Sequence, residues 1–200
     1  MLVETKKILL TGGGTSGHVT PNIAIAERLI EFGYSLEYIG RKTGIEYDLM
    51  KNIVSHYYGI HSGKFRRYFD LKNLFDLFSI FIGFTEAIYQ LFNSKPDIIF
   101  SKGGFVTCPV VRAGWILKIP IIIHESDFSP GLANRLSIPF AKVICTTFKK
   151  SIKSRKTIFT GLPVRRIFQT GVGREGEKNA NLMILHLLYS LWEGVKVRKQ

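Results

Sequence analysis

The sequence predicts an α/β fold in which helices cover both faces of a parallel sheet. Residues 8–10, 98–100 and 121–123 are short segments made only of Ile, Leu and Phe. They alternate along the chain with longer segments whose apolar residues recur at helical spacing. Strands of such continuous apolar composition are typical of parallel sheets that are buried on both faces. With 200 residues, the chain is long enough for one domain of ordinary size and short for two such domains.

The first expected strand leads directly into a glycine-rich turn. Residues 8–10 form the strand, and a helix is expected from Pro21 onwards because apolar residues recur there at helical spacing. The intervening turn has glycine at positions 12, 13, 14 and 17. Glycines allow a tight turn with outward N–H groups, and the helix dipole adds partial positive charge behind them. This loop is therefore predicted to bind an anion such as a phosphate or a carboxylate.

The same glycines allow a second interpretation, a dinucleotide site. Gly12, Gly14 and Gly17 match the pattern GxGxxG, but such a site also has an acidic residue about 20 positions further on, after the second strand. The expected second strand, residues 35–40, is followed instead by basic residues beginning with Arg41. This argues against nicotinamide or flavin binding. The loop does not match a Walker phosphate loop either, because no GKS or GKT follows.

The next elements follow in regular order. Gly33 is expected to end the first helix, and residues 35–40 form the second strand. Residues 43–50 have a helical pattern, residues 56–70 are expected to be a loop rich in aromatic and basic side chains, and residues 71–92 are expected to be a long helix.

The second half of the chain continues the alternation. A strand at residues 96–100 precedes a second glycine turn at residues 101–105, and Pro109 is expected to begin a helix. The remaining expected elements are a strand at 120–125, a short helix at 131–141, and strands at 142–147 and 156–161. Together they predict a sheet of six or seven strands that is complete by about Pro163. Both glycine turns and residues 124–127 lie at the carboxyl ends of strands, where open α/β sheets bind ligands.

The composition indicates an anionic partner. The formal net charge is +13 and the pI is about 9.8, which suits nucleic acid, an acidic membrane surface or phosphorylated substrates. Nucleic acid is not expected, because no RRM, KH or helix-turn-helix signature is present. The two cysteines, Cys108 and Cys145, lack metal-ligand spacing and are too few for a disulfide framework. We therefore expect no metal site and two buried thiols in a reducing compartment.

The segment of residues 64–92 combines basic and large apolar side chains. It predicts a helix that packs on the sheet, and it equally suits a patch that dips into an anionic lipid interface; the two roles are compatible on different faces. The basic members are Lys64, Arg66, Arg67 and Lys72. The most apolar part, residues 77–84, is too short to span a membrane, and the N-terminus does not resemble an export signal.

Three motifs, in order, resemble the N-terminal domain of the MurG family of glycosyltransferases. They are GGGTSGH at residues 12–18, SKGGFVTCPVVRA at residues 101–113, and IPIIIHESDFSPGLANRL at residues 119–136 with TGLPVR at residues 160–165. The resemblance covers roughly residues 6–168. It implies the N-terminal half of a GT-B enzyme, which has two Rossmann-like domains, an inverting mechanism, and neither metal nor cofactor. Such an enzyme transfers N-acetylglucosamine from UDP-N-acetylglucosamine to lipid I for peptidoglycan synthesis, as a peripheral protein on the cytoplasmic face of the bacterial membrane.

The resemblance also implies roles for individual residues. His18 matches the proposed base or organiser for the acceptor hydroxyl, a task that suits an imidazole of near-neutral pKa. Thr15 and the glycines of both loops would cradle the acceptor diphosphate, and Arg165 would contact it at the hinge. The acceptor-binding set is Gly13, Gly14, Thr15, Ser16, Gly17, Gly103, Gly104, Phe105, Glu125, Ser126, Asp127, Asn134 and Arg165. The membrane patch of the family corresponds to Leu74, Phe75, Phe78, Phe81 and Trp115, with Arg66, Arg67 and Lys72 nearby.

The chain departs from the family pattern at two site positions and at its C-terminal end. Phe105 occupies a position where the family often has Tyr, and Asp127 one where Asn is common. Residues 1–168 are expected to form the acceptor-binding domain. Residues 169–200 are expected to be a linker and a truncated or frameshifted start of the donor domain, since no second glycine-rich loop for the uridine nucleotide follows.

Three functional interpretations stay open. The chain is an acceptor half of the transferase with little activity alone, a non-catalytic membrane-recruiting subunit similar to Alg14 that needs a separate donor chain, or a relative of enzymes that add sugar to diacylglycerol. The HESD and LPVR segments favour the first over the third.

Overall fold

The computed structural model describes residues 6–63 and 72–163, with side chains in the second range from Phe78 onwards. These residues form a sheet of seven strands, all parallel, in the order β3-β2-β1-β4-β5-β6-β7. The strands are β1 (Lys7–Thr11), β2 (Ser35–Arg41), β3 (His56–Ile60), β4 (Ile98–Ser101), β5 (Ile121–Glu125), β6 (Val143–Thr146) and β7 (Thr157–Phe159). The helices are α1 (Ser16–Glu31), α2 (Ile45–Met50), α3 (Lys72–Ser94), α4 (Thr107–Ile116) and α5 (Leu132–Ser137), followed by the 3₁₀ helix η1 (Ile138–Phe140).

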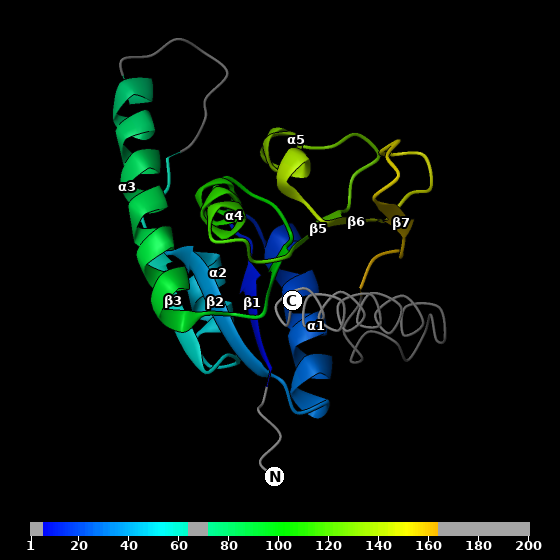
Figure 1. Ribbon diagram of the computed structural model, residues 1–200, viewed down its shortest axis with the longest axis horizontal. Coiled ribbons are helices and arrows are strands. Elements are labelled where there is room, and N and C mark those ends of the chain that lie inside the picture. The colour runs from blue at the N-terminus through cyan, green and yellow to red at the C-terminus, as the bar shows by residue number, and fades with distance from the viewer. Residues whose placement is uncertain (1–5, 64–71, 164–200) are drawn as a thin grey trace.

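The sheet has a hydrophobic core on each face, as the continuous apolar strands predict. Ile8 and Leu10 of β1 point to the face covered by α1, where they join a cluster with residues such as Leu29. Leu9, between them, points to the opposite face and packs with α3 and α4, for example with Val110. Alternate residues of one strand therefore pack against two layers of helices (Figure 1), which is the reason residues 8–10, 98–100 and 121–123 are all apolar.

The strand order reverses between β1 and β4. Ile8 of β1 pairs with Leu36 of β2 on one side and with Ile98 of β4 on the other. The chain leaves these neighbouring strands in opposite directions, which opens a crevice at their carboxyl ends. The loops after β1, β4 and β5 all lie at this edge of the sheet (Figure 1), and each contributes residues that line a cavity there.

Two predicted helix starts and one predicted loop are wrong. α1 begins at Ser16 and α4 at Thr107, not at Pro21 and Pro109. Pro109 is the third residue of α4, where a missing N–H costs no helical hydrogen bond, and α1 accommodates Pro21 inside the helix. Residues 56–60, expected to be part of a loop, form strand β3, because Tyr and Ile side chains pack well on a half-buried edge strand.

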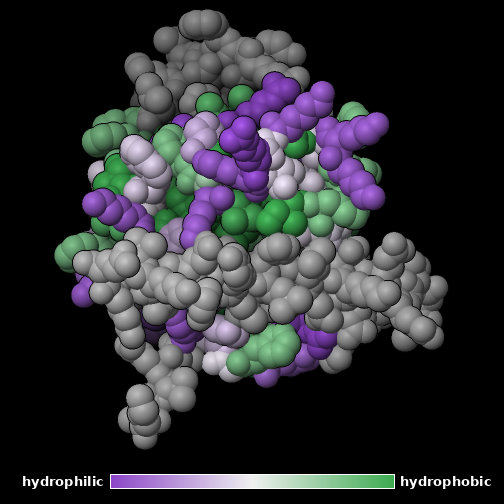
Figure 2. All heavy atoms as spheres, turned by 45° about the vertical axis from the view of Figure 1, so that its right-hand side comes forward, coloured by the Kyte–Doolittle hydropathy of each residue, from purple (hydrophilic) through white to green (hydrophobic). Residues whose placement is uncertain are grey.

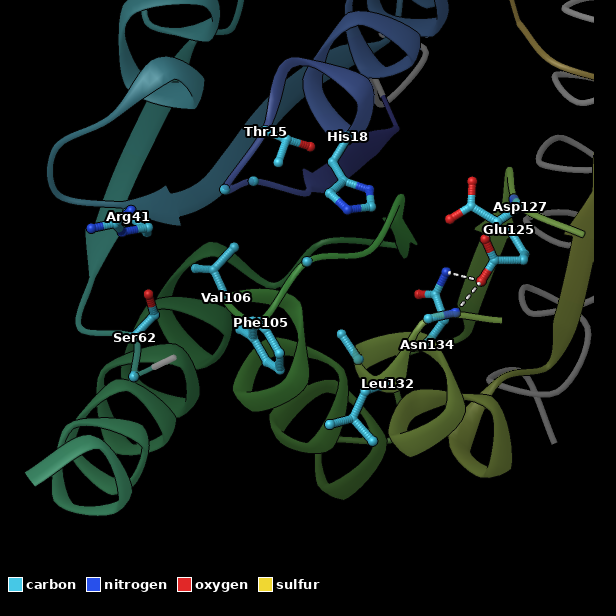
Figure 3. A pocket seen from close by; sticks show the side chains of 16 residues that line it. Thr15, His18, Arg41, Ser62, Phe105, Val106, Glu125, Asp127, Leu132 and Asn134 are labelled. Carbon is cyan, nitrogen blue, oxygen red and sulfur yellow. Dashed lines mark hydrogen bonds between the residues drawn. The ribbon is translucent and has the colours of Figure 1, made fainter. Parts of the chain in front are cut away.

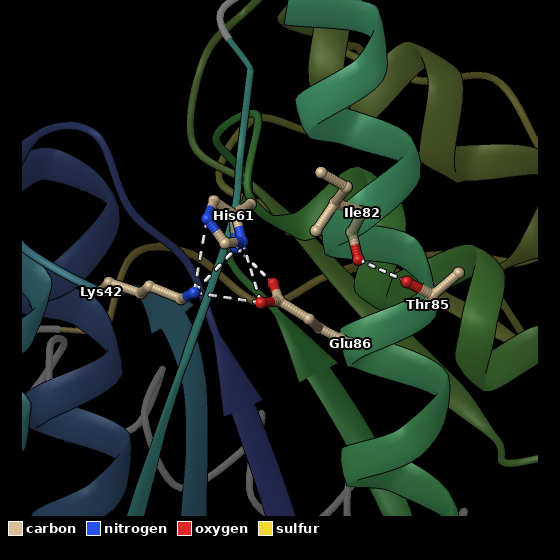
Figure 4. Close-up of polar contacts among 5 residues, drawn as sticks. All are labelled: Lys42, His61, Ile82, Thr85 and Glu86. Atoms are coloured by element: carbon tan, nitrogen blue, oxygen red, sulfur yellow. Dashed lines mark hydrogen bonds and ion pairs between the residues drawn. The ribbon is translucent and has the colours of Figure 1, made fainter.

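The segment that follows β3 is fixed against α3 by polar contacts (Figure 4). Glu86 of α3 accepts a hydrogen bond from the backbone N–H of His61 at 2.6 Å and contacts His61 Nδ1 at 2.8 Å and Lys42 Nζ at 3.1 Å. The backbone at His61 approaches α3 so closely that a Cβ atom on Gly83 would lie 1.9 Å from the carbonyl oxygen of His61. These contacts determine where Ser62 lies at the edge of the crevice.

His124 makes the stability of this fold depend on pH. Its side chain on β5 is fully buried, and Nε2 lies 3.0 Å from the carbonyl oxygen of Gly161. Burial, and next the positive charge of Lys102, lower the pKa of His124 from 6.5 to about 3. The unfolded chain therefore binds one more proton at this site between these two pH values, and the free energy of unfolding falls as pH decreases through that window.

We expect His124→Gln to reduce this dependence, because glutamine places an amide nitrogen near the position of Nε2 and does not titrate. The slope of the free energy of unfolding against pH, measured by urea denaturation between pH 6.5 and 4, should be smaller by up to about 1.4 kcal/mol per pH unit. The carboxylates contribute equally to both proteins and cancel in the comparison. Equal slopes in the two proteins would show that His124 does not stay neutral in the fold.

Candidate functional site

A cavity of about 450 Å³ lies at the carboxyl ends of the strands, beside the reversal point (Figure 3). Of the residues predicted from the sequence, the cavity is lined by Gly13, Gly14, Thr15, His18, Gly104, Phe105, Glu125, Asp127 and Asn134. Ser16, Gly17, Gly103 and Ser126 are near neighbours in the chain but do not line it. Arg165 lies outside the described residues. The cavity also contains residues that the sequence did not single out for the site, including Arg41, Ser62, Val106 and Leu132.

The two glycine loops touch each other. The N–H of Gly13 donates to the carbonyl oxygen of Gly103 at 3.2 Å, and a Cβ atom on Gly104 would lie 2.1 Å from the carbonyl oxygen of Gly13. Gly104 also has a positive φ of 93°, which side chains rarely adopt. The first loop is further held by the Tyr38 hydroxyl, which donates to the carbonyl oxygen of Gly12 at 2.8 Å. These glycines are therefore needed for loop contact.

Glu46 of α2 supports the first loop from behind. Its side chain is fully buried, and Oε2 accepts a hydrogen bond from the N–H of Gly14 at 3.3 Å. Oε1 has no hydrogen-bond partner among the described residues. The N–H groups of Gly13 and Gly14 thus donate within the protein, so the anion-binding role expected of them stays a prediction. Thr15 precedes α1 without a side-chain capping bond.

His18 lies in the first turn of α1 and points into the cavity (Figure 3). Burial lowers its pKa below 6.5, and the positive charge of Lys102 lowers it further, while Asp127 and Glu125 act in the opposite direction. Nδ1 is buried and has no hydrogen-bond partner among the described residues. The imidazole is therefore neutral at pH 7 and able to accept a proton.

The two carboxylates of the cavity differ in their surroundings. Glu125 accepts hydrogen bonds from the N–H of Asp127 at 2.9 Å, from the N–H of Gly131 at 3.2 Å and from Nδ2 of Asn134 at 2.9 Å. These bonds occupy Glu125 in shaping the turn between β5 and α5. Asp127 is exposed, and its carboxylate faces the cavity from the wall beyond His18 (Figure 3). Asp127 is thus the carboxylate available to a ligand, and Glu125 and Asn134 position it.

Lys102 is a charged residue that the sequence analysis missed. It follows β4 directly, is fully buried, and donates a hydrogen bond from Nζ to the Ser126 hydroxyl. Burial lowers its pKa to about 8, although Glu125 and Asp127 favour the charged form. The available signal was its position: a lysine between the strand IIFS and two glycines, at the edge of the sheet where ligands bind.

The opposite end of the cavity is formed by the strands β2 and β3. Arg41 ends β2, and Ser62 follows β3 by two residues (Figure 3). In the sequence, Arg41 served only as evidence against a dinucleotide site. The structure places it at the cavity, where a guanidinium group is suited to an anionic ligand. The cavity is therefore basic at one end and acidic at the other.

The long helix α3 has a buried face and an aromatic exposed face. Ala87 and Leu91 are buried against the sheet. The exposed aromatic residues of α3 are spaced three or eight residues apart. With their exposed fractions, they are Phe78 (65%), Phe81 (63%), Tyr89 (65%) and Phe92 (63%). Trp115 of α4 is 56% exposed and packs on Phe140, with ring centroids 5.3 Å apart. The predicted packing on the sheet is confirmed, and three predicted members of the membrane patch, Phe78, Phe81 and Trp115, are exposed.

The other predicted members of the patch are not described. Arg66 and Arg67 lie outside the described residues, as do the side chains of Lys72, Leu74 and Phe75. No helix within residues 6–63 and 72–163 is long and apolar enough to cross a membrane.

Positive charge also gathers at the far edge of the sheet. Lys149, Lys150, Lys153 and Arg155 are exposed between β6 and β7. Figure 2, in which the β7 side of Figure 1 is turned forward, shows hydrophilic side chains projecting beside a hydrophobic band. No group of three or more His, Cys, Asp or Glu residues able to hold a metal ion occurs in the part of the chain that the structure describes.

Comparison with known families gives a match that agrees with this geometry. The model of the glycosyltransferase family 28 N-terminal domain matches residues 8–146, which run from the second residue of β1 to the end of β6 and include every described residue of the cavity. The chain belongs to this family. The family 28 match thus covers six of the seven strands and the cavity at their carboxyl ends, and β7 lies beyond it.

Several curated relatives of this family 28 chain share one name. The UDP-N-acetylglucosamine–N-acetylmuramyl-(pentapeptide) pyrophosphoryl-undecaprenol N-acetylglucosamine transferase of Clostridium kluyveri is 51% identical over 164 residues, which is 80% of this chain and 46% of the relative. The protein of the same name from Clostridium tetani is 51% identical over 86% of this chain and 49% of the relative. The chain therefore spans about half the length of the curated relatives it matches.

Solved structures show the same fold. MurG of Acinetobacter baumannii superimposes with a TM-score of 0.66 at 26% identity, over 76% of this chain and 45% of that chain. The UDP-GlcNAc 2-epimerase of Neisseria meningitidis, solved with UDP-GlcNAc bound, gives a TM-score of 0.58 at 14% identity over 78% of this chain and 46% of that chain. The second likeness shows the fold alone. The family 28 domain corresponds in each case to less than half of the solved chain.

The contact between the two glycine loops leads to a stability prediction. Gly104→Ala should lower the free energy of unfolding by at least about 2 kcal/mol, because the new Cβ meets the Gly13 carbonyl and the backbone is left-handed. Gly131→Ala is the matched control on the same cavity. Gly131 has a φ of −62°, and a Cβ atom added there would have no neighbouring atom within 4 Å, so alanine should change stability by less than about 1 kcal/mol. Equal stability losses in urea denaturation would contradict the loop contact.

Proposed function

We propose that this chain is the acceptor-binding half of a glycosyltransferase that moves N-acetylglucosamine from UDP-N-acetylglucosamine to lipid I, forming lipid II. The observation that carries the proposal is the 51% sequence identity to transferases of that name over 80% or more of this chain. The cavity supports it, because a neutral imidazole, an exposed carboxylate and a helix N-terminus converge there. The donor nucleotide would bind mainly to the half of the relatives that this chain does not cover.

In this proposal His18 is the general base. The acceptor hydroxyl oxygen forms a bond to the anomeric carbon of N-acetylglucosamine, the bond from that carbon to the diphosphate oxygen breaks, and UDP leaves with the electron pair. The hydroxyl proton passes to the neutral imidazole of His18. Attack from the face opposite the leaving group inverts the anomeric centre. No metal or cofactor is required, since the imidazole and hydrogen-bond donors supply the proton transfer and charge stabilisation.

The acceptor diphosphate is proposed to lie at the start of α1. The N–H groups of Ser16 and Gly17 belong to the first turn, which has no acidic residue, and the helix dipole favours an anion there. The hydroxyl of Thr15, the residue before α1, lines the cavity and is a side-chain donor at this place. Asp127 and Asn134, at the other end of the cavity, are proposed to contact the sugar of the acceptor. Arg165 remains a proposed diphosphate contact outside the described residues.

The exposed aromatic residues of α3 and α4 are proposed to bind the membrane. Phe78, Phe81 and Trp115 are exposed large apolar side chains of the kind that would enter a lipid interface near the site of a lipid-linked acceptor. The high positive charge of the chain favours an anionic lipid surface. We therefore propose peripheral attachment to the cytoplasmic face of the bacterial membrane.

His18→Ala tests the catalytic proposal. Transfer of labelled N-acetylglucosamine to a lipid I analogue would be measured with the 200-residue chain supplemented with the C-terminal half of the Clostridium kluyveri relative. The rate constant should fall by about 10² to 10⁴, with binding of the analogue changed by only a few-fold. Because the pKa of His18 is lowered, the unchanged chain should keep its full rate at pH 7 and lose activity only below pH 6.5.

Thr20→Ala, two residues along α1 and outside the cavity, is the control and should keep the rate. An unchanged rate in His18→Ala would contradict the role of the base. Transfer to diacylglycerol in place of lipid I would favour the glycolipid synthase. Binding of lipid I without transfer in any sample would favour a recruiting subunit.

The membrane proposal is tested with vesicles. Phe78→Ser with Phe81→Ser should reduce co-sedimentation of the chain with phosphatidylglycerol vesicles by about tenfold or more, because two aromatic groups of this kind contribute a few kcal/mol when buried. Phe32→Ser is the matched control, since Phe32 is 58% exposed at the end of α1, away from α3. Equal losses in both proteins would mean that α3 does not form the membrane contact.

A further inference from the structure

The ammonium group of Lys102 is buried beside this site, and the proposed reaction gives it no role. The backbone N–H of Lys102 donates to the carbonyl oxygen of Thr11 at 2.9 Å, which extends the pairing of β1 with β4 by one residue. Its side chain is fully buried and reaches Ser126, which follows β5. One residue therefore connects the ends of three adjacent strands beneath the cavity.

Four titratable groups face this ammonium. Glu125 and Asp127, from the end of β5, favour its charge. The imidazoles of His18 on α1 and His124 on β5 are held neutral partly by that same charge. Of these groups, His18, Glu125 and Asp127 line the cavity, whereas Lys102 does not. Lys102 therefore acts on a ligand only through its neighbours.

Packing alone does not explain a charge at this position. The pKa of Lys102 is lowered to about 8 in spite of two nearby carboxylates, which means that the fold disfavours the charged form. An apolar side chain of similar length would fill the space without this cost. A perturbed, buried cation beside a cavity is characteristic of a functional site.

We propose that Lys102 is a positioning residue whose buried ammonium, hydrogen-bonded to Ser126, offsets the carboxylates of Glu125 and Asp127 so that the cavity accepts a phosphate-bearing ligand. The inference rests on the proposed function, because it concerns the same acceptor diphosphate. Without Lys102 the acidic end of the cavity would carry two uncompensated negative charges and would repel that group. The His18 imidazole would also be protonated more readily, since both carboxylates favour its charged form.

The test is a double-mutant cycle between Lys102→Met and Asp127→Asn in the full chain. The probe is inorganic pyrophosphate, with binding and the pKa of His18 both followed by NMR. In Lys102→Met the dissociation constant for pyrophosphate should rise by about tenfold or more, and the pKa of His18 should rise by about one unit. Adding Asp127→Asn should return the dissociation constant to within about threefold of its original value and the pKa of His18 to within about half a unit of its original value.

The control is Lys153→Met, which removes the same charge from an exposed position between β6 and β7 and should change neither value. Unchanged values in Lys102→Met, or no recovery in the double variant, would overturn the proposal. If the original chain does not bind pyrophosphate, the proposed diphosphate site is wrong, and the pKa of His18 alone then decides the role of Lys102.

A second measurement does not depend on the folding of Lys102→Met. The pKa of Lys102 itself can be followed in the original chain and in Asp127→Asn by carbon-13 NMR of the lysine Cε. It should lie near 8 in the original chain and fall by half a unit or more in Asp127→Asn, because the carboxylate stabilises the ammonium. A pKa near 10.5, or one that Asp127→Asn leaves unchanged, would overturn the proposal.

Discussion

The parallel pairing of β1 with β2 on one side and β4 on the other determines the geometry of the whole site. Because the chain leaves these strands in opposite directions, no helix among residues 6–63 and 72–163 covers their carboxyl ends, and the loops meet there directly. The hydrogen bond from the N–H of Gly13 to the carbonyl oxygen of Gly103 joins the two glycine loops. This contact requires a residue without a side chain at position 104. His18 is placed by the same constraint, since α1 begins immediately after the first loop.

The electrostatics of the cavity follow from which charges are buried at this junction. Glu125 is fully occupied by hydrogen bonds from its own turn, and Glu46 supports the first loop from below. Lys102 is the buried cation that faces the acidic end, and its charge contributes to the low pKa of His18. The neutral imidazole of His18 beside two carboxylates therefore follows first from its own burial and then from the buried lysine.

The sequence predicted the layers of the fold well, because continuous apolar strands and helical periodicity are local signals. It located most of the cavity for the same reason, since glycine turns and polar residues follow strands at a common edge. It missed β3, whose edge position gives it a mixed composition, and it missed Glu46, Lys102 and Arg41 as site residues. The burial of Glu46 and Lys102 arises from contacts between distant segments, as with Lys102 and Ser126, and no local pattern reports such contacts.

The position of α3 relates the cavity to the surface proposed to bind lipid. Close contact at Gly83 and the hydrogen bonds of Glu86 fix residue 61 against this helix, and Ser62 then lines the cavity. Helix α3, which carries the exposed aromatic residues, therefore also holds the segment that leads from β3 to the cavity. A lipid-linked diphosphate that entered from the membrane would meet Arg41 and the start of α1 before its sugar reached His18 and Asp127. The proposed acceptor would then have its diphosphate at the basic end of the cavity and its sugar beside His18 and Asp127.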